Sequence, residues 1–147
     1  MLKATGDRQG TFEIRQNGEL LTTFQKKLRF QLAAKEYAVR RSNAIKPFYS
    51  LHHDEAVLAT AEHTSILRSS FNICHAGRTW TMKPEGFMSR SAGIYADETT
   101  KVGSFVPKSY FFPNKEIAID LPPEITLEAQ VFLLWVFLRM LDARSSD

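Results

Sequence analysis

Hydrophobic and polar residues alternate along most of this chain. In the run TFEIR, Phe12 and Ile14 occupy alternate positions, with Glu13 and Arg15 between them. The same alternation recurs in KLRFQL, in EYAVR, at Leu67, Phe71 and Ile73, at Trp80 and Met82, and in EIAIDL. A period of two is typical of strands that bury one face. Strands are therefore predicted from about residue 10 to about residue 121.

Turn-forming residues separate these runs. Asn17-Gly18 is a strong hairpin signal, and His75-Ala76-Gly77 joins FNICH to RTWTMK as a second hairpin. Further breaks fall at residues 53–55, 84–86, 97–98 and 113–115. Strands at a spacing of about 8–12 residues are typical of an all-β sandwich or barrel. The pattern predicts a mainly β fold of roughly ten to twelve short antiparallel strands.

The last part of the chain changes its period. Pro122-Pro123 ends the final strand, because proline cannot continue a hydrogen-bonded ladder. Thr126 is a plausible N-cap, and Glu128 places negative charge near the start of a helix. Between Leu127 and Leu141 the only polar residues are Glu128, Gln130 and Arg139. A hydrophobic helix is predicted over about residues 124–143.

This helix is apolar on every side. A bilayer-spanning helix needs about 20 apolar residues, whereas VFLLWVFL is interrupted by Arg139 after Leu138. We therefore predict no transmembrane span. A helix that is hydrophobic all round is buried all round. With strands as its only neighbours, it is predicted to lie inside an antiparallel β-barrel, within a single domain of residues 1–147.

The composition indicates the class of protein and its cellular compartment. With 44% hydrophobic and 24% charged residues, the chain fits a globular domain with a real core. Cys74 is the only cysteine, so neither an intrachain disulfide nor a cysteine-based metal cluster can form. The N-terminus lacks the apolar run of a signal peptide. We expect a cytoplasmic protein.

Charge is distributed unevenly. Residues 1–50 hold ten Lys and Arg against four Asp and Glu, while the remainder carries an acidic excess. Two successive strands and their flanks carry the basic candidates, which are Lys26, Lys27, Arg29, Arg40, Arg41 and Lys46. If these strands pair, the charges form one patch for phosphate-bearing partners such as lipid headgroups. An ordinary solvated basic surface is the alternative interpretation.

The succession of FEIRQNG, KEYAVRR, FNICHAGRTWTMK and KVGSFV, followed by EIAIDLPPEITLEAQVFLLWVFLRML, resembles the tubby C-terminal-like superfamily. The similarity covers nearly the whole chain and is greatest to the small LURP-one-related type. It implies a barrel around a central hydrophobic helix. It also suggests phosphoinositide binding, as in tubby-like domains, or action at membranes, as in scramblases. Asp120, Glu124 and Glu128 are too spread out for the calcium loop of scramblases, so no functional residue is carried over.

Other motifs favour structural interpretations. We interpret HHDE, residues 52–55, as a polar hairpin loop rather than a metal site, because His52 and His53 would point to opposite faces of a strand. We expect Cys74 to be a buried strand cysteine and Trp80 to belong to the core. There is no nucleophile elbow and no glycine-rich phosphate loop. We predict no catalytic residue, no metal site and no cofactor.

Four functions remain open. The first is a non-enzymatic module that docks on an anionic membrane surface as a peripheral protein. The second is an interaction domain for a protein partner or a homodimer, suggested by the aromatic run SYFFP at residues 109–113. A barrel for a small apolar ligand is third, although a filled barrel leaves little cavity. An enzyme is the weakest reading. Nucleic acid is disfavoured, because the paired aromatic residues of RNA-recognition modules are missing.

Overall fold

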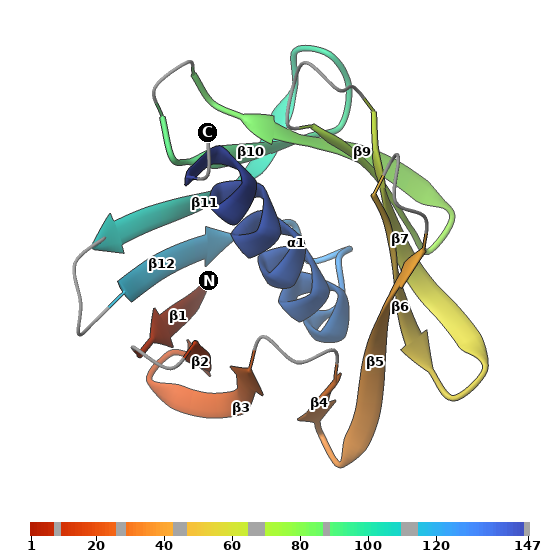
Figure 1. Ribbon diagram of the computed structural model, residues 1–147, viewed down its shortest axis with the longest axis vertical. Helices are drawn as coiled ribbons and strands as arrows, with labels where there is room; N and C mark the ends of the chain where they lie inside the picture. Colours follow the sequence, from red (N-terminus) through yellow and green to blue (C-terminus); the bar gives the residue numbers. More distant parts are fainter. Residues whose placement is uncertain are drawn as a thin grey trace.

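The computed structural model describes residues 1–7, 10–25, 29–42, 47–64, 70–86, 89–109 and 115–145. It is mainly β, with twelve antiparallel strands in a nearly closed barrel and one C-terminal helix (Figure 1). The strands are β1 Leu2–Gly6, β2 Thr11–Gln16, β3 Glu19–Gln25, β4 Arg29–Leu32, β5 Lys35–Ser42, β6 Phe48–His53, β7 Ala56–His63, β8 Phe71–His75, β9 Arg78–Pro84, β10 Ala92–Tyr95, β11 Lys101–Ser109 and β12 Lys115–Asp120. The helix is α1, Leu127–Ser145. The predicted fold class is confirmed.

Apart from β3 and β4, strands that follow one another in the chain pair with each other, and β1 also pairs with β12. In that last ladder Leu2 lies opposite Ile119 and Ala4 opposite Ile117. Strand β1 precedes the range predicted for strands, and α1 begins three residues later than predicted and ends two later. A run as short as LKATG gives only two or three alternations, which is too few to stand out as a strand.

The seam of the barrel lies between β3 and β4. Over the residues that the structure describes, no backbone ladder joins these two strands. The hydroxyl of Thr22 instead donates to the carbonyl oxygen of Gln31 over 2.5 Å. The rings of Phe24 and Phe30 meet edge to face with centroids 6.0 Å apart. Side chains thus close the barrel where the backbone does not.

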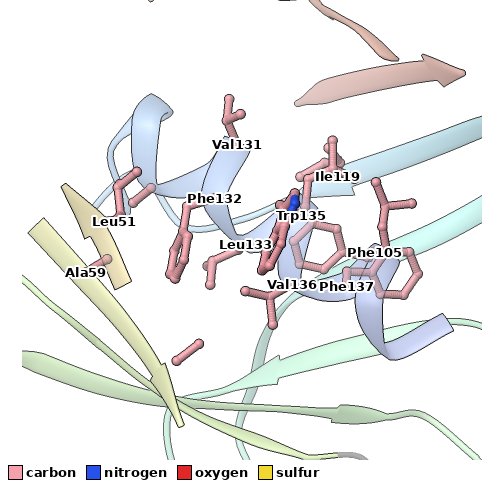
Figure 2. Packing of buried hydrophobic residues seen from close by; sticks show 14 of the residues in the cluster. Leu51, Ala59, Phe105, Ile119, Val131, Phe132, Leu133, Trp135, Val136 and Phe137 are labelled. Carbon is pink, nitrogen blue, oxygen red and sulfur yellow. The ribbon is translucent and has the colours of Figure 1, made fainter. Parts of the chain in front are cut away.

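Helix α1 runs through the middle of the barrel (Figure 1). All eight residues from Val131 to Leu138 are buried, as their all-round hydrophobicity predicts. Phe137 stacks on Phe105 of β11 with centroids 5.0 Å apart, and Trp135 meets the edge of Tyr49 of β6 at 4.8 Å. Figure 2 shows Phe132, Trp135 and Phe137 of the helix between Leu51 and Ala59 on one side and Phe105 and Ile119 on the other. None of the helices in the described ranges is long and apolar enough to cross a bilayer.

The start of α1 is tied to the wall. His75 Nδ1 lies 2.8 Å from the carbonyl oxygen of Leu58, which can only accept, so Nδ1 donates. The other ring nitrogen, Nε2, then accepts from the backbone N–H of Thr126 at 3.4 Å and from its hydroxyl at 3.3 Å. Thr126 is therefore placed just before the helix, as predicted, but its hydroxyl binds a histidine of β8.

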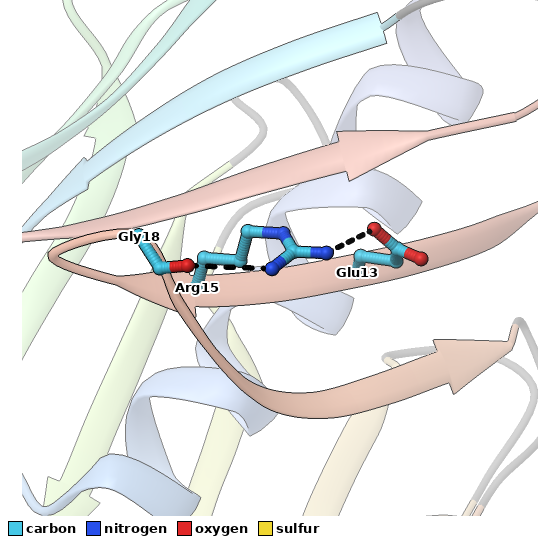
Figure 3. Close-up of polar contacts among 3 residues, drawn as sticks. All are labelled: Glu13, Arg15 and Gly18. Atoms are coloured by element: carbon cyan, nitrogen blue, oxygen red, sulfur yellow. Dashed lines mark hydrogen bonds and ion pairs between the residues drawn. The ribbon is translucent and has the colours of Figure 1, made fainter.

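Tight turns join the strands at one end of the barrel. Asn17-Gly18 and Ala76-Gly77 both have positive φ, which matches the type I′ turns that fit the twist of a hairpin. At the first of these, Arg15 donates to the carbonyl oxygen of Gly18 and pairs with Glu13 (Figure 3). The two predicted hairpins are thus confirmed.

The turn between β4 and β5 departs from this chemistry. Its central residues, Ala33 and Ala34, have φ of 51° and 64°, a region that costs a residue with a Cβ about 1–2 kcal/mol. Alanine is not a turn signal, so a type I′ turn was not predictable at these two residues.

We expect the double variant Ala33→Asn, Ala34→Gly to unfold at a higher urea concentration, with a gain of about 1 kcal/mol, because Asn-Gly adopts this turn readily. A matched control is Ala118→Gly in β12, which should lower stability because glycine weakens a strand interior. A double variant less stable than the wild type would contradict the assigned turn.

Candidate functional site

The candidate site is an open hollow of about 220 Å³ on the wall formed by β4, β5 and β6. Its lining residues are Arg29, Glu36, Tyr37, Ala38, Arg40, His52 and Asp54. We refer to it as the β4–β6 hollow. On β4, exposed Arg29 alternates with buried Phe30, and on β5, exposed Arg40 alternates with buried Val39. The arginines therefore stand on the outer face of the barrel.

Strand register explains why these side chains meet. Arg29 lies opposite Ala38, and Ala38 lies opposite His52, so the three form one row across the sheet. Ala38 has only a methyl group, which leaves space between its larger neighbours. Arg40 is two residues along β5 and lies opposite Ser50. Diagonal neighbours on one face of a sheet are about 7–8 Å apart, within the reach of two arginine side chains.

The two ends of the hollow differ in charge. Arg40 stands at one end, whereas Glu36 of β5 and Asp54 of the turn after β6 stand at the other. Arg29 Nη1 lies 3.4 Å from Glu36 Oε1, and Asp54 Oδ2 lies 3.7 Å from His53 Nε2. Arg40 makes no ion pair with any residue in the described ranges. Its guanidinium is thus the cation most available to a ligand.

His52 forms a buried wall of the hollow. Its side chain is 9% exposed, and Nε2 shares a hydrogen bond of 2.7 Å with the hydroxyl of Ser50. Nδ1 is buried and has no hydrogen-bond partner in the part of the chain that the structure describes. Burial and the nearby charge of Arg40 lower the pKa of His52, against the opposite effect of Glu55. The imidazole is therefore held neutral beside the arginine at physiological pH.

The lowered pKa of His52 predicts a pH-dependent stability. The unfolded chain takes up this proton near its ordinary pKa of about 6.5, whereas the folded protein takes it up only at lower pH. The contribution to stability is thus fully present above about pH 6.5 and is lost as the pH falls toward the folded pKa. We expect His52→Asn to flatten the fall in melting temperature between pH 7.5 and pH 5. His53→Asn is the control, and an equal flattening there would contradict the assignment.

The six predicted basic residues do not all come together. Arg29 and Arg40 share the β4–β6 hollow. Arg41 is exposed but follows Arg40 directly on β5, so it points to the other side of the strand, at the rim of the barrel. Lys26, Lys27 and Lys46 lie outside the described residues. The two strands that carry the basic candidates do pair, which was the condition for a shared patch.

Several residues that line the β4–β6 hollow were not predicted as site residues from the sequence. His52 and His53 were assigned to a hairpin loop, but they belong to β6, and only Asp54 and Glu55 form the turn. The outward parity of His52 would have suggested exposure, whereas it is buried. Ala38 carried a usable signal, because a small residue at an outward strand position leaves room between longer side chains.

Two other predictions can be compared with the structure, and a third falls outside the described residues. The expectation that Cys74 is buried was wrong, because it faces outward on β8, between inward-facing Ile73 and His75. Trp80 is buried in the core, as predicted. The aromatic residues of 110–112, which suggested a protein partner, lie outside the described residues. Among the described residues, no three His, Cys, Asp or Glu side chains are grouped to hold a metal.

No protein-family model matches this chain, and searches of curated proteins and of solved structures find no match either. The resemblance to the tubby C-terminal-like superfamily stays a prediction.

Proposed function

We propose that the protein is a non-enzymatic binding module that recognises anionic phospholipid headgroups through the β4–β6 hollow. The proposal rests on Arg40. Its guanidinium lines an open hollow and has no ion-pair partner in the described chain. Arginine binds phosphate oxygens through two parallel N–H donors, which suits it to headgroup recognition. The protein would then be a peripheral protein of the cytoplasmic leaflet.

The surroundings of the hollow support this use. Arg29 lies within reach of the same ligand, because it stands in the row of Ala38, two residues from Arg40 on the outer face. Arg29 and Arg40 lie on paired strands rather than on a loop, so backbone ladders fix their positions. Near an anionic leaflet each arginine contributes about 1 kcal/mol, and salt screens this attraction.

The interior of the barrel offers less support for an apolar ligand. Its axis is occupied by Phe132, Trp135 and Phe137, each at most 2% exposed. A volume of about 220 Å³ for the outer hollow is also below the 300–1,000 Å³ range of pockets for drug-sized ligands, and fits a headgroup better.

Vesicle co-sedimentation tests the proposal. We expect the wild type to bind vesicles containing anionic lipid, to ignore neutral phosphatidylcholine vesicles, and to dissociate at high salt. Arg40→Glu removes one favourable charge and adds a repulsive one, a change of about 2 kcal/mol, so its affinity should fall more than tenfold.

The matched control is Arg78→Glu, which changes the net charge equally at an exposed position at the start of β9. It should weaken binding no more than threefold. Equal losses in the two variants would show that binding depends only on the net charge of the protein, against a site at the hollow. The absence of binding by the wild type at low salt would overturn the proposal.

A further inference from the structure

The β4–β6 hollow carries two signs of charge, which a site for a simple anion would not need. Arg29 and Arg40 bring two positive charges, and Glu36 and Asp54 bring two negative ones. His52 is held neutral beside them. A purely anionic group would gain from the arginines but would be repelled by the carboxylates. The lining therefore complements a group that itself carries both charges.

These charges are ordered along the hollow. Arg40 lies opposite Ser50, whose hydroxyl shares a hydrogen bond with His52, so a cation stands at one end. Glu36 and Asp54 stand four residues away along β5 and two residues beyond His52, which separates them from Arg40 by about 13 Å of strand. Arg29 occupies the middle, opposite Ala38. The hollow thus has a basic end and an acidic end.

A second observation points to a ligand between them. His52 is nine-tenths buried in the wall of the hollow, and its Nδ1 has no hydrogen-bond partner among the described residues. Buried polar atoms are nearly always paired, so this nitrogen calls for a partner such as a water or a bound group.

From this arrangement we infer that the hollow selects an aminophosphate headgroup, with its phosphate at Arg29 and Arg40 and its primary ammonium at Glu36 and Asp54. The inference rests on the proposed function and narrows it from anionic lipid in general to aminophospholipids such as phosphatidylserine, whose own carboxylate must then lie away from Glu36 and Asp54. Phosphatidylglycerol carries the same net charge but has no ammonium for the carboxylates. A quaternary ammonium could not donate hydrogen bonds to them.

The test compares vesicles containing equal fractions of phosphatidylserine or phosphatidylglycerol in phosphatidylcholine. We expect the wild type to bind phosphatidylserine vesicles about tenfold more tightly. In the double variant Glu36→Gln, Asp54→Asn this preference should disappear, while binding to phosphatidylglycerol rises because Arg29 loses its acidic partner. Glu13→Gln, at the exposed pair with Arg15 on β2, is the control and should keep the preference.

The outcomes separate the two proposals. Equal binding of the wild type to both anionic vesicles would overturn the selectivity and leave headgroup binding intact. Binding to neither would overturn both. A preference that survives in the double variant would also overturn the inference, because the carboxylates would then not recognise the ammonium.

A titration with soluble ligands distinguishes a membrane lipid from a free metabolite as the bound molecule. Calorimetric titration with O-phosphoethanolamine should show weaker binding than the vesicles, yet stronger binding than inorganic phosphate. Binding to O-phosphoethanolamine tighter than to the vesicles would overturn the assignment to a membrane lipid. Equal affinity for O-phosphoethanolamine and phosphate would overturn the role of the ammonium.

Discussion

Replacing Phe137 with alanine is expected to lower the free energy of unfolding by about 3–5 kcal/mol. Phe137 is fully buried at the centre of α1, and its ring stacks on Phe105 of β11. The substitution loses the burial of the ring, the stacking interaction and the packing of the wall around it. Domains of this size are typically stable by only 5–15 kcal/mol, so the loss is a large fraction of the total.

Urea unfolding followed by tryptophan fluorescence measures this change. Val57→Ala is the control, because Val57 is 56% exposed and its truncation should cost less than about 1 kcal/mol. If Phe137→Ala cost no more than Val57→Ala, α1 would not lie inside the barrel. Should the variant fail to fold, Phe137→Leu, which keeps most of the volume, should recover a cooperative transition at reduced stability.

Gly103→Ala is the second substitution with a large expected effect. A Cβ on this glycine would lie 2.5 Å from the backbone oxygen of Asp120 and 3.1 Å from Cδ2 of Leu121. The first contact is with backbone, which cannot turn aside as a side chain can. We expect β11 and the end of β12 to be forced apart, at a cost of about 1–3 kcal/mol or more.

Gly86→Ala is the matched control for this change. Its Cβ would meet only the Cβ of Ser89 at 3.7 Å, an ordinary contact. Thermal unfolding of the two variants should therefore differ by several degrees. Similar melting temperatures for both would show that β11 and β12 do not approach each other so closely at Gly103.

The fold was largely predictable because its strands and its helix leave different patterns in the sequence. Strands that bury one face alternate with a period of two, whereas the fully buried helix is apolar on every side. Alternation placed Phe12 and Ile14, Tyr37 and Val39, and Ile117 and Ile119 in the core, and all six are buried. Because α1 is apolar all round, it had to be surrounded by strands, and a barrel was therefore predicted. Strand β1 and the Ala33-Ala34 turn escaped prediction, because tertiary pairing with β12 and β2 stabilises a short strand, and hairpin closure overrides the preference of alanine.

The site was less predictable. Sequence alternation put Arg29 on the outer face, and the pairing of β4 with β5 brought it to Arg40. Alternation could not show that Glu36 pairs with Arg29, or that Asp54 reaches the same hollow from the turn after β6. These facts depend on register, which a single sequence leaves open. Arg29 and Arg40 of the predicted basic patch thus lie in a hollow that also carries two carboxylates.

The most direct measurement for the proposed site is an NMR titration of the isotope-labelled protein with short-chain phosphatidylserine below its micelle concentration. We predict that the largest amide shifts fall at Arg29, Ala38, Arg40 and His52, where the hollow lies, with little change on the wall formed by β9, β10 and β11. Shifts centred on that opposite wall, or none at saturating lipid, would contradict it.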